Sequence, residues 1–233
     1  MKLGIIGGLG PMATTYFMEM ITEMTLADKD QDHIEMIVIS KPDIPDRTAF
    51  ILGRSSEDPL PPINEVAERL VSYGADVIAI PCITAHCFHD KLCANVDTRI
   101  LNAVYETTNT LKAGGIRKAG IMATDGTVSC ELFQNAFRKE GIEPVVPDPD
   151  IQALVMSLIY DEIKAGKKPS GDKLDKILSS FREKGAEKVV LGCTELSLLR
   201  RENFDLSMTV DAMEELAKAS IRACGKEIRE EYL

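Results

Sequence analysis

Short runs of apolar residues alternate along the chain with longer segments that are apolar on one face only. The short runs are rich in Val and Ile and end at Gly, Pro or Asp, as is typical of strands buried in a parallel sheet. The pattern predicts strands at Lys2–Ile6, Glu35–Ser40, Val77–Ile80, Lys118–Met122, Glu143–Val146 and Lys188–Leu191. It predicts helices at Thr14–Thr25, Pro62–Tyr73, Ala85–Leu92, Ile100–Ala113, Ser129–Glu140, Ile151–Ala165, Gly171–Glu183 and Asp211–Ala223. This alternation indicates an α/β fold.

The second half of the chain resembles the first. Gly74–Cys82 reads GADVIAIPC and Gly185–Cys193 reads GAEKVVLGC, so each cysteine follows a glycine by eight residues. Gly4–Gly10 likewise aligns with Gly120–Gly126, 116 residues later, whereas the offset between the cysteines is 111 residues. Agreement at both ends favours a duplication with one net loop deletion over chance similarity of two βα units.

We therefore predict two similar α/β domains, each a mainly parallel sheet flanked by helices and related to the other by a pseudo-twofold axis. The first domain is expected at 1–114, completed by 209–233, and the second at 115–208, with the boundary at Gly114-Gly115. Because open α/β sheets bind ligands at the carboxyl ends of their strands, the active site is expected in the cleft between the domains.

Composition narrows the classes of partner. A formal net charge of −10 without a Lys/Arg-rich stripe argues against binding to nucleic acid. No apolar run approaches the length of a membrane span, and the start MKLGIIGG does not read as a signal peptide. Six cysteines in irregular spacing do not resemble a disulfide framework, so we expect reduced thiols and a cytoplasmic location.

Two of the cysteines have a position suited to chemistry. Cys82 and Cys193 are each expected at the carboxyl end of a buried strand, where two similar domains would bring them face to face. Such a pair suits a reaction that needs a base on one face of a carbon and an acid on the other. The remaining thiols lie in predicted helices and are expected to be packing residues, namely Cys87, Cys93, Cys130 and Cys224.

Two other interpretations of the motifs are weaker. The glycine-rich loop from Gly7 has Ala13 where a dinucleotide-binding fingerprint needs its third glycine, and Pro11 removes a backbone N–H, so a small carboxylate fits this loop better. Cys82, His86, His89 and Cys93 share one helical face, but adjacent turns of one helix cannot surround an ion. We therefore predict no metal.

Six motifs, in this order along essentially the whole chain, resemble those of the aspartate/glutamate racemase family. They are Gly7-Gly8-Leu9-Gly10-Pro11-Met12-Ala13-Thr14, Pro45-Asp46-Arg47-Thr48, Pro81-Cys82-Ile83-Thr84-Ala85-His86, Ala123-Thr124-Asp125-Gly126-Thr127, Ile163-Lys164-Ala165-Gly166 and Leu191-Gly192-Cys193-Thr194-Glu195-Leu196. The resemblance implies a cofactor-independent homodimer that interconverts the enantiomers of aspartate or glutamate.

It also implies roles for single residues. Cys82 and Cys193 would exchange protons with opposite faces of the substrate. Arg47, in a loop made rigid by Pro42 and Pro45, and Lys164 would hold its distal carboxylate, and Thr84 and Thr194 its α-carboxylate. The remaining implied site residues are Met12, Thr124 and Thr127, which would line the pocket, and Glu195, which would orient or tune the second thiol.

One position departs from the family pattern. The family usually has asparagine between the first cysteine and the threonine, where this chain has Ile83, which cannot form an amide's hydrogen bonds. Two alternatives therefore stay open. One is a related isomerase or lyase acting on a maleate, hydantoin or malonate, and the other is a catalytically silent protein that binds a dicarboxylate.

Overall fold

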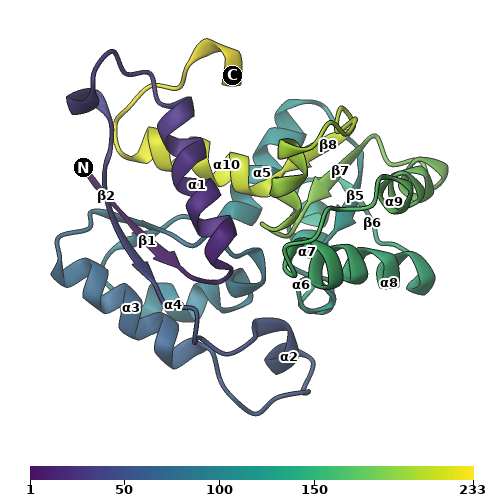
Figure 1. Cartoon of the computed structure of the whole chain (residues 1–233), viewed down its shortest axis with the longest axis horizontal. Coiled ribbons are helices and arrows are strands. Elements are labelled where there is room, and N and C mark those ends of the chain that lie inside the picture. Colours follow the sequence, from purple (N-terminus) through teal and green to yellow (C-terminus); the bar gives the residue numbers. More distant parts are fainter.

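The computed structural model describes all 233 residues and contains two four-stranded sheets (Figure 1). The first sheet has the order β2-β1-β3-β4 and the second β6-β5-β7-β8, with every pairing parallel. The strands are β1 (Lys2–Gly7), β2 (Glu35–Ser40), β3 (Val77–Ala79), β4 (Arg99–Ile100), β5 (Lys118–Met122), β6 (Glu143–Val145), β7 (Lys188–Leu191) and β8 (Thr209–Asp211). Both sheets thus have the same order, which confirms the predicted α/β fold of two similar halves.

The helices flank these sheets. They are α1 (Pro11–Met24), α2 (Arg47–Ile51), α3 (Leu60–Ser72), α4 (His89–Asn95), α5 (Ala103–Ala113), α6 (Asp125–Ser129), α7 (Leu132–Lys139), α8 (Pro149–Ser157), α9 (Gly171–Glu183) and α10 (Ala212–Ala223). Shorter helical segments are η1 (Asp30–Asp32), η2 (Ile83–Phe88), η3 (Leu158–Ile163), η4 (Leu196–Arg201) and η5 (Glu230–Tyr232). Three helices near the site begin with an N-cap residue whose side chain accepts a hydrogen bond from a backbone N–H of the first turn. These residues are Asp46 for α2, Asn102 for α5 and Thr124 for α6.

The predictions of local structure were wrong in several places. The helix predicted at Ala85–Leu92 is a 3₁₀ helix, η2, followed by α4, and the one predicted at Ser129–Glu140 is broken by the left-handed residue Glu131. The segment predicted as one helix from Ile151 changes to a π-helix at Leu158. Strands β4 and β8 were missed because two or three residues are too short to show a period of two.

The two halves share part of their core. One cluster of 30 buried residues includes Leu3 of β1, Ile121 of β5 and Leu216 of α10. Helix α10 packs on α1 and α5 (Figure 1), whereas the adjoining strand β8 pairs with β7 in the second sheet. The segment 209–233 therefore contacts both halves, and the predicted domain boundaries stay a prediction. No helix is both long enough and apolar enough to cross a membrane.

Candidate active site

The two aligned cysteines lie at corresponding places in the two sheets. Cys82 follows β3 and precedes η2, and Cys193 follows β7, the strand at the same position in the second sheet. Both side chains are buried, with 5% of each residue exposed. Both line one cavity between the halves. The structure thus brings together two thiols that are 111 residues apart in the sequence.

This cavity, which we call the thiol chamber, is closed in the structure. Its volume of about 10 Å³ leaves room for roughly one water molecule. Nine predicted site residues line it: Arg47, Cys82, Ile83, Thr84, Thr124, Lys164, Cys193, Thr194 and Glu195. Of the other two, Thr127 lies buried behind the chamber wall, and Met12, at 58% exposed, lines an adjoining pocket instead.

That adjoining outer pocket is larger, with a volume of about 540 Å³. Four charged side chains line both spaces, namely Asp46, Arg47, Lys164 and Glu195. They form the partition between the outer pocket and the thiol chamber. A substrate that enters from this side therefore meets two cations and two anions before it reaches the thiols.

Glu195 connects Cys193 to this partition. The Cys193 thiol donates to Glu195 Oε2 at 2.9 Å. The other oxygen, Oε1, is buried without a hydrogen-bond partner and lies against Gly10, where a Cβ would come within 2.7 Å of it. Burial and then the Glu195 carboxylate raise the pKa of Cys193 well above its usual range. Cys193 is therefore a protonated thiol at neutral pH.

Lys164 faces Glu195 from the end of the helical segment η3. Its Nζ lies 3.7 Å from Glu195 Oε1 and 4.4 Å from the centre of the Tyr160 ring. Burial disfavours the charged ammonium, but Glu195 and then Cys193 outweigh burial and raise the pKa of Lys164. The ammonium therefore stays charged inside the partition and can bind a carboxylate.

Arg47 is the cation nearest to Cys82. Although it begins α2 it is buried, and its guanidinium donates to the backbone oxygens of Pro45 at 3.0 Å and Leu9 at 3.3 Å. Burial disfavours its charge, but the Cys82 sulfur opposes this effect and raises the pKa of Arg47. The carboxylates of Asp46 and Glu195 act in the same direction as the sulfur with smaller effects. A fixed cation beside a thiol stabilises the thiolate form.

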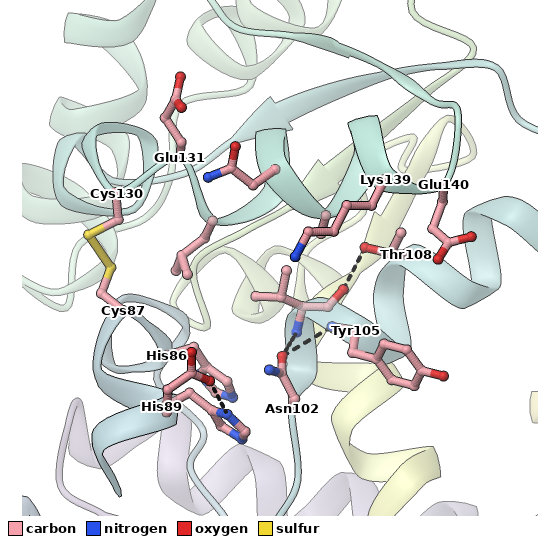
Figure 2. Close-up of a pocket in the computed structure, with 15 residues that line it drawn as sticks. His86, Cys87, His89, Asn102, Tyr105, Thr108, Cys130, Glu131, Lys139 and Glu140 are labelled. Atoms are coloured by element: carbon pink, nitrogen blue, oxygen red, sulfur yellow. Dashed lines mark hydrogen bonds and ion pairs between the residues drawn. A yellow bond between two sulfur atoms is a disulfide. The ribbon is translucent and has the colours of Figure 1, made fainter. Parts of the chain in front are cut away.

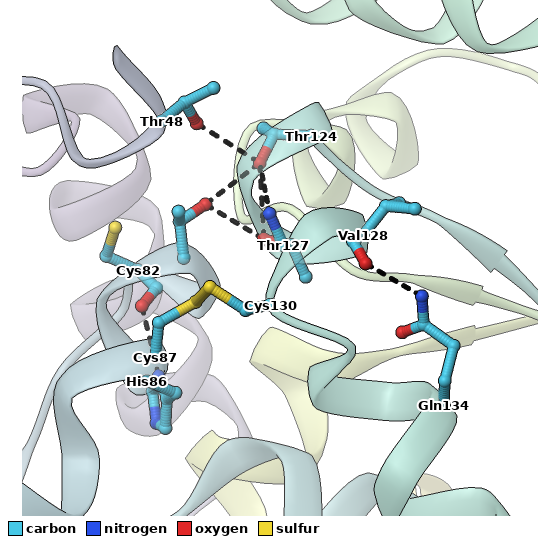
Figure 3. The surroundings of a disulfide bond; sticks show 10 residues. Thr48, Cys82, His86, Cys87, Thr124, Thr127, Val128, Cys130 and Gln134 are labelled. Carbon is cyan, nitrogen blue, oxygen red and sulfur yellow. Dashed lines mark hydrogen bonds between the residues drawn. A yellow bond between two sulfur atoms is a disulfide. The ribbon is translucent and has the colours of Figure 1, made fainter. Parts of the chain in front are cut away.

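A cluster of threonines joins the two halves beside the chamber. Thr84 of η2 hydrogen-bonds Thr124 at 3.0 Å and Thr127 at 2.9 Å, and Thr48 of α2 donates to Thr124 at 3.3 Å (Figure 3). Gly126 permits this approach, because a Cβ there would lie 2.9 Å from the Thr48 Cα. These hydroxyls hold the segments after β3 and β5 in contact.

His86 supports the Cys82 turn from behind. The N–H of Ala103 donates to His86 Nε2 at 3.2 Å, so Nδ1 carries the ring proton and donates to the Cys82 carbonyl at 3.0 Å. Burial lowers the pKa of His86 to about 4, so the ring is neutral. His86 stacks on His89, at one end of the pocket drawn in Figure 2. No three His, Cys, Asp or Glu side chains lie close enough together to hold a metal.

The prediction that all six thiols are free was wrong. Cys87 of η2 and Cys130, at the end of α6, form a disulfide across the two halves (Figure 3). The other four cysteines are free, and among them Cys224 is buried and Cys93 is exposed. Sequence spacing did not reveal the pair because the two residues are 43 positions apart and meet only through the contact of η2 with α6.

The chamber also contains four residues to which the sequence had assigned no role, three of them within the quoted motifs and one, Tyr160, outside them. They are Leu9, Asp46, Thr48 and Tyr160. The Tyr160 hydroxyl donates to Asp46 Oδ2 at 3.4 Å, which links η3 to the loop before α2. A helical spacing of four between Tyr160 and Lys164 was the available signal, because residues one turn apart share a face.

Comparison with known proteins agrees with this arrangement. A relative from Bacillus subtilis named as a broad specificity amino-acid racemase is 24% identical over 94% of this chain and 96% of its own length. The aspartate racemase of Picrophilus torridus superposes with a TM-score of 0.83 and 31% identity over 99% of this chain and 97% of its own. An aspartate racemase homologue from Pyrococcus horikoshii gives 0.78 and 24% identity over 96% and 99% of the two chains. The predicted resemblance and the predicted enzyme class, an amino-acid racemase, are thereby confirmed. The model of the Asp/Glu/Hydantoin racemase family matches residues 6–220, and the chain belongs to that family.

Proposed function

We propose that the protein interconverts the L- and D-enantiomers of an acidic amino acid by proton transfer between Cys82 and Cys193, without a cofactor. The observation that carries the proposal is that both thiols line one chamber together with the cations Arg47 and Lys164. Two thiols at matched strand ends provide the acid and the base, and the two cations provide binding for carboxylates.

The surroundings of the thiols assign their roles in the free enzyme. Cys82 has the buried cation Arg47 beside it, whereas burial and Glu195 raise the pKa of Cys193 and keep it protonated. The Cys82 thiolate removes the α-proton from one face, and the Cys193 thiol donates its proton to the opposite face. Cys82 is then a thiol and Cys193 a thiolate, which is the form that catalyses the reverse reaction.

Removal of the α-proton needs stabilisation of negative charge next to the α-carboxylate. We assign this task to the Thr84 and Thr194 hydroxyls, which line the chamber, and to the backbone amides of the segments after β3 and β7. Since the chamber holds only about one water molecule, the substrate has to open the partition. Its distal carboxylate competes with Glu195 for Lys164, which lies 3.7 Å from Glu195.

Deuterium exchange tests this proposal directly. The protein is incubated with L-aspartate or L-glutamate in deuterated water, and α-deuterium and the D-enantiomer are measured by mass spectrometry and chiral chromatography. We expect both to accumulate with wild type, and neither above background with Cys82→Ser or Cys193→Ser. Absence of exchange and of D-enantiomer across acidic amino acids would overturn the assignment.

A second candidate is a racemase of amino acids with less polar side chains. Ile83 favours it, because this buried apolar side chain lines the chamber where the family usually has asparagine. The similarity to the broad specificity racemase of Bacillus subtilis supports the same candidate. A panel of acidic, neutral and unsaturated substrates with wild type and Ile83→Asn separates the two, since only the second candidate predicts higher kcat/KM for neutral amino acids than for acidic ones.

The homodimer and the cytoplasmic location belong to this proposal as well. The family resemblance supports the dimer, whereas the Cys87–Cys130 disulfide is of a kind rare in the cytosol, so the location rests on the sequence patterns alone. Light scattering coupled to size-exclusion chromatography would measure the mass in solution. A mass near 51 kDa, twice the 25.6 kDa of one chain, is the expected result.

A further inference from the structure

The Cys87–Cys130 disulfide lies directly behind the segments that carry the active-site residues. We propose that it is a reversible site of thiol–disulfide exchange that controls how firmly the Cys82 turn is held against the second half of the molecule. Its effect on catalysis rests on the racemase function proposed above. Its chemistry and its effect on local structure do not.

Helix η2 is held by contacts with both halves of the molecule. On the side of its own sheet, His86 bonds the Cys82 carbonyl at 3.0 Å and accepts from the first residue of α5 at 3.2 Å. On the side of the second sheet, Thr84 bonds Thr124 and Thr127, and Cys87 is linked to Cys130, which caps the end of α6. The disulfide is the one covalent bond between η2 and α6.

A reductant can reach this bond. Cys87 and Cys130 are each partly exposed and line a pocket of about 450 Å³ between α5 and α7 (Figure 2). The active-site thiols are not part of that pocket, because Cys82 and Cys193 are buried in the thiol chamber. The pocket lining carries one lysine, Lys139, and three carboxylates, Asp90, Glu131 and Glu140, so an uncharged small dithiol suits it better than an anionic one.

The dithiol supplies the two electrons that reduction of the disulfide requires. A thiolate of the dithiol attacks one sulfur of the Cys87–Cys130 bond, forms a mixed disulfide and releases the other sulfur as a thiolate that takes up a proton. The second thiol of the reductant then attacks the mixed disulfide and releases the protein sulfur. Two electrons pass from the dithiol, which becomes a disulfide, to the cysteine pair, which becomes two thiols. A small disulfide such as oxidised glutathione reverses the reaction in the same two steps.

Reduction leaves the two hydrogen bonds of the Thr84 hydroxyl, to Thr124 and Thr127, to hold η2 on α6. We expect the Cys82 turn to lose precise placement, and kcat/KM to fall about tenfold, since a shift of about 1 Å in an active site costs up to about 100-fold. Backbone amides of Ile83–Phe88 and Asp125–Ser129 should exchange with deuterium faster in the reduced protein, because both segments lose a covalent restraint.

The experiment compares wild type after oxidised glutathione with wild type after a dithiol, and with the double variant Cys87→Ser/Cys130→Ser. Alkylation in denaturant should count four thiols in the oxidised protein and six in the reduced one. Activity and amide exchange of the double variant should match reduced wild type and should not respond to the dithiol. The matched controls Cys93→Ser and Cys224→Ser should keep the response of wild type.

Several results would overturn the proposal. One is six alkylated thiols after oxidised glutathione, because the bond would then not form. Another is equal activity and equal amide exchange in oxidised and reduced wild type. If amide exchange changes but no substrate is racemised in either state, the thiol–disulfide site stands and the proposed racemase function fails.

Discussion

The segments that follow β3 and β7 occupy the same place in two sheets of the same strand order, yet they surround their cysteines with opposite charges. Cys82 has the buried cation Arg47 as its neighbour, and Cys193 donates to the carboxylate of Glu195. Duplication therefore explains where the two thiols lie, but not how they differ. The difference comes from side chains that are not equivalent in the two halves.

Each half also contains one buried titratable group with a shifted pKa, and the two shifts have opposite directions. Behind Cys82 lies the buried base His86, whose pKa burial lowers to about 4. In the second half, the buried acid Asp211 pairs with Leu191 of β7 and accepts from Ser197 of η4 at 2.7 Å, and burial raises its pKa to about 6. One half thus contains a neutral histidine and the other an aspartate that resists ionisation.

Removing either thiol should have the largest effect on the rate of racemisation. Cys82→Ala and Cys193→Ala should each lower kcat for racemisation by about 10³-fold or more, because an acid without an opposing base cannot invert the carbon. Chiral chromatography of both reaction directions measures this. The variant Cys224→Ala, which removes a thiol outside the chamber, should retain the rate of wild type. Equal rates in all three variants would exclude the two thiols from the chemistry.

The two buried groups His86 and Asp211 should make opposite contributions to the pH dependence of the free energy of unfolding. The folded pKa of His86 is below its ordinary value of 6.5, so its contribution to stability is lost as the pH falls from about 6.5 to 4. The folded pKa of Asp211 is above its ordinary value of 3.8, so its contribution to stability is lost as the pH rises from about 3.8 to 6. Each shift corresponds to about 3 kcal/mol, and in wild type the two nearly cancel.

Single variants separate these contributions. Between pH 4 and 6.5, the free energy of unfolding of Asp211→Asn should rise with pH, because the His86 contribution remains, and that of His86→Gln should fall. Urea denaturation at several pH values gives the slopes, which are independent of the constant cost of each substitution. Slopes of the same sign in both variants would contradict the prediction.

Replacing the cation beside Cys82 tests whether the site needs the geometry of a guanidinium or only its positive charge. Arg47→Lys keeps a positive charge but loses the planar donors that bind three backbone oxygens, so kcat/KM should fall by about 10- to 100-fold. Arg54→Lys is the matched control, since its side chain is 65% exposed and lies 4.0 Å from Asp125. Steady-state kinetics should leave this control near wild type, and a similar loss in both variants would argue against a specific role for Arg47.

Removing the anion beside Cys193 should make the two thiols more alike. Glu195→Gln should lower the pKa of Cys193, because the carboxylate that raises it is gone while Lys164 remains. Alkylation of Cys193 by iodoacetamide at fixed pH should therefore be faster than in wild type, because the thiolate is the form that reacts. Mass spectrometry of the Cys193 peptide measures the rate, with Glu202→Gln as the control. A slower rate would contradict the assigned role of Glu195.

The smallest effect is expected at Tyr160. Tyr160→Phe removes the hydroxyl that donates to Asp46 at 3.4 Å but keeps the ring below Lys164, so KM should rise about two- to fivefold with little change in kcat. The exposed Tyr73 provides the control Tyr73→Phe. A change in kcat larger than in KM would place Tyr160 in the proton transfer rather than in binding.

Much of the architecture was predictable from the sequence because it depends on local patterns. The periodicity of apolar residues located six strands, and the aligned segments before Cys82 and Cys193 indicated the repeat. Strands β4 and β8 escaped because they are too short for a pattern. The break at Glu131 escaped because a left-handed backbone at a glutamate is rare.

The chamber was predictable only in part. Arg47, Lys164 and Glu195 were indicated by motifs, and all three line it. Tyr160 and Asp46, 114 residues apart, carry no motif that connects them, and the Cys87–Cys130 pair contradicted the expectation of free thiols. Such contacts depend on how separate loops are packed, and local sequence does not encode that packing.

The sequence by itself determined the α/β fold, the position of each thiol at the end of a strand, and the family. Tertiary structure decided which charges surround each thiol, that four charged side chains close the chamber, and that η2 is linked to α6. The physical reason is distance. Backbone patterning acts over a few residues, whereas burial and charge, which set the protonation of Cys193 and Arg47, depend on groups brought together from remote parts of the chain.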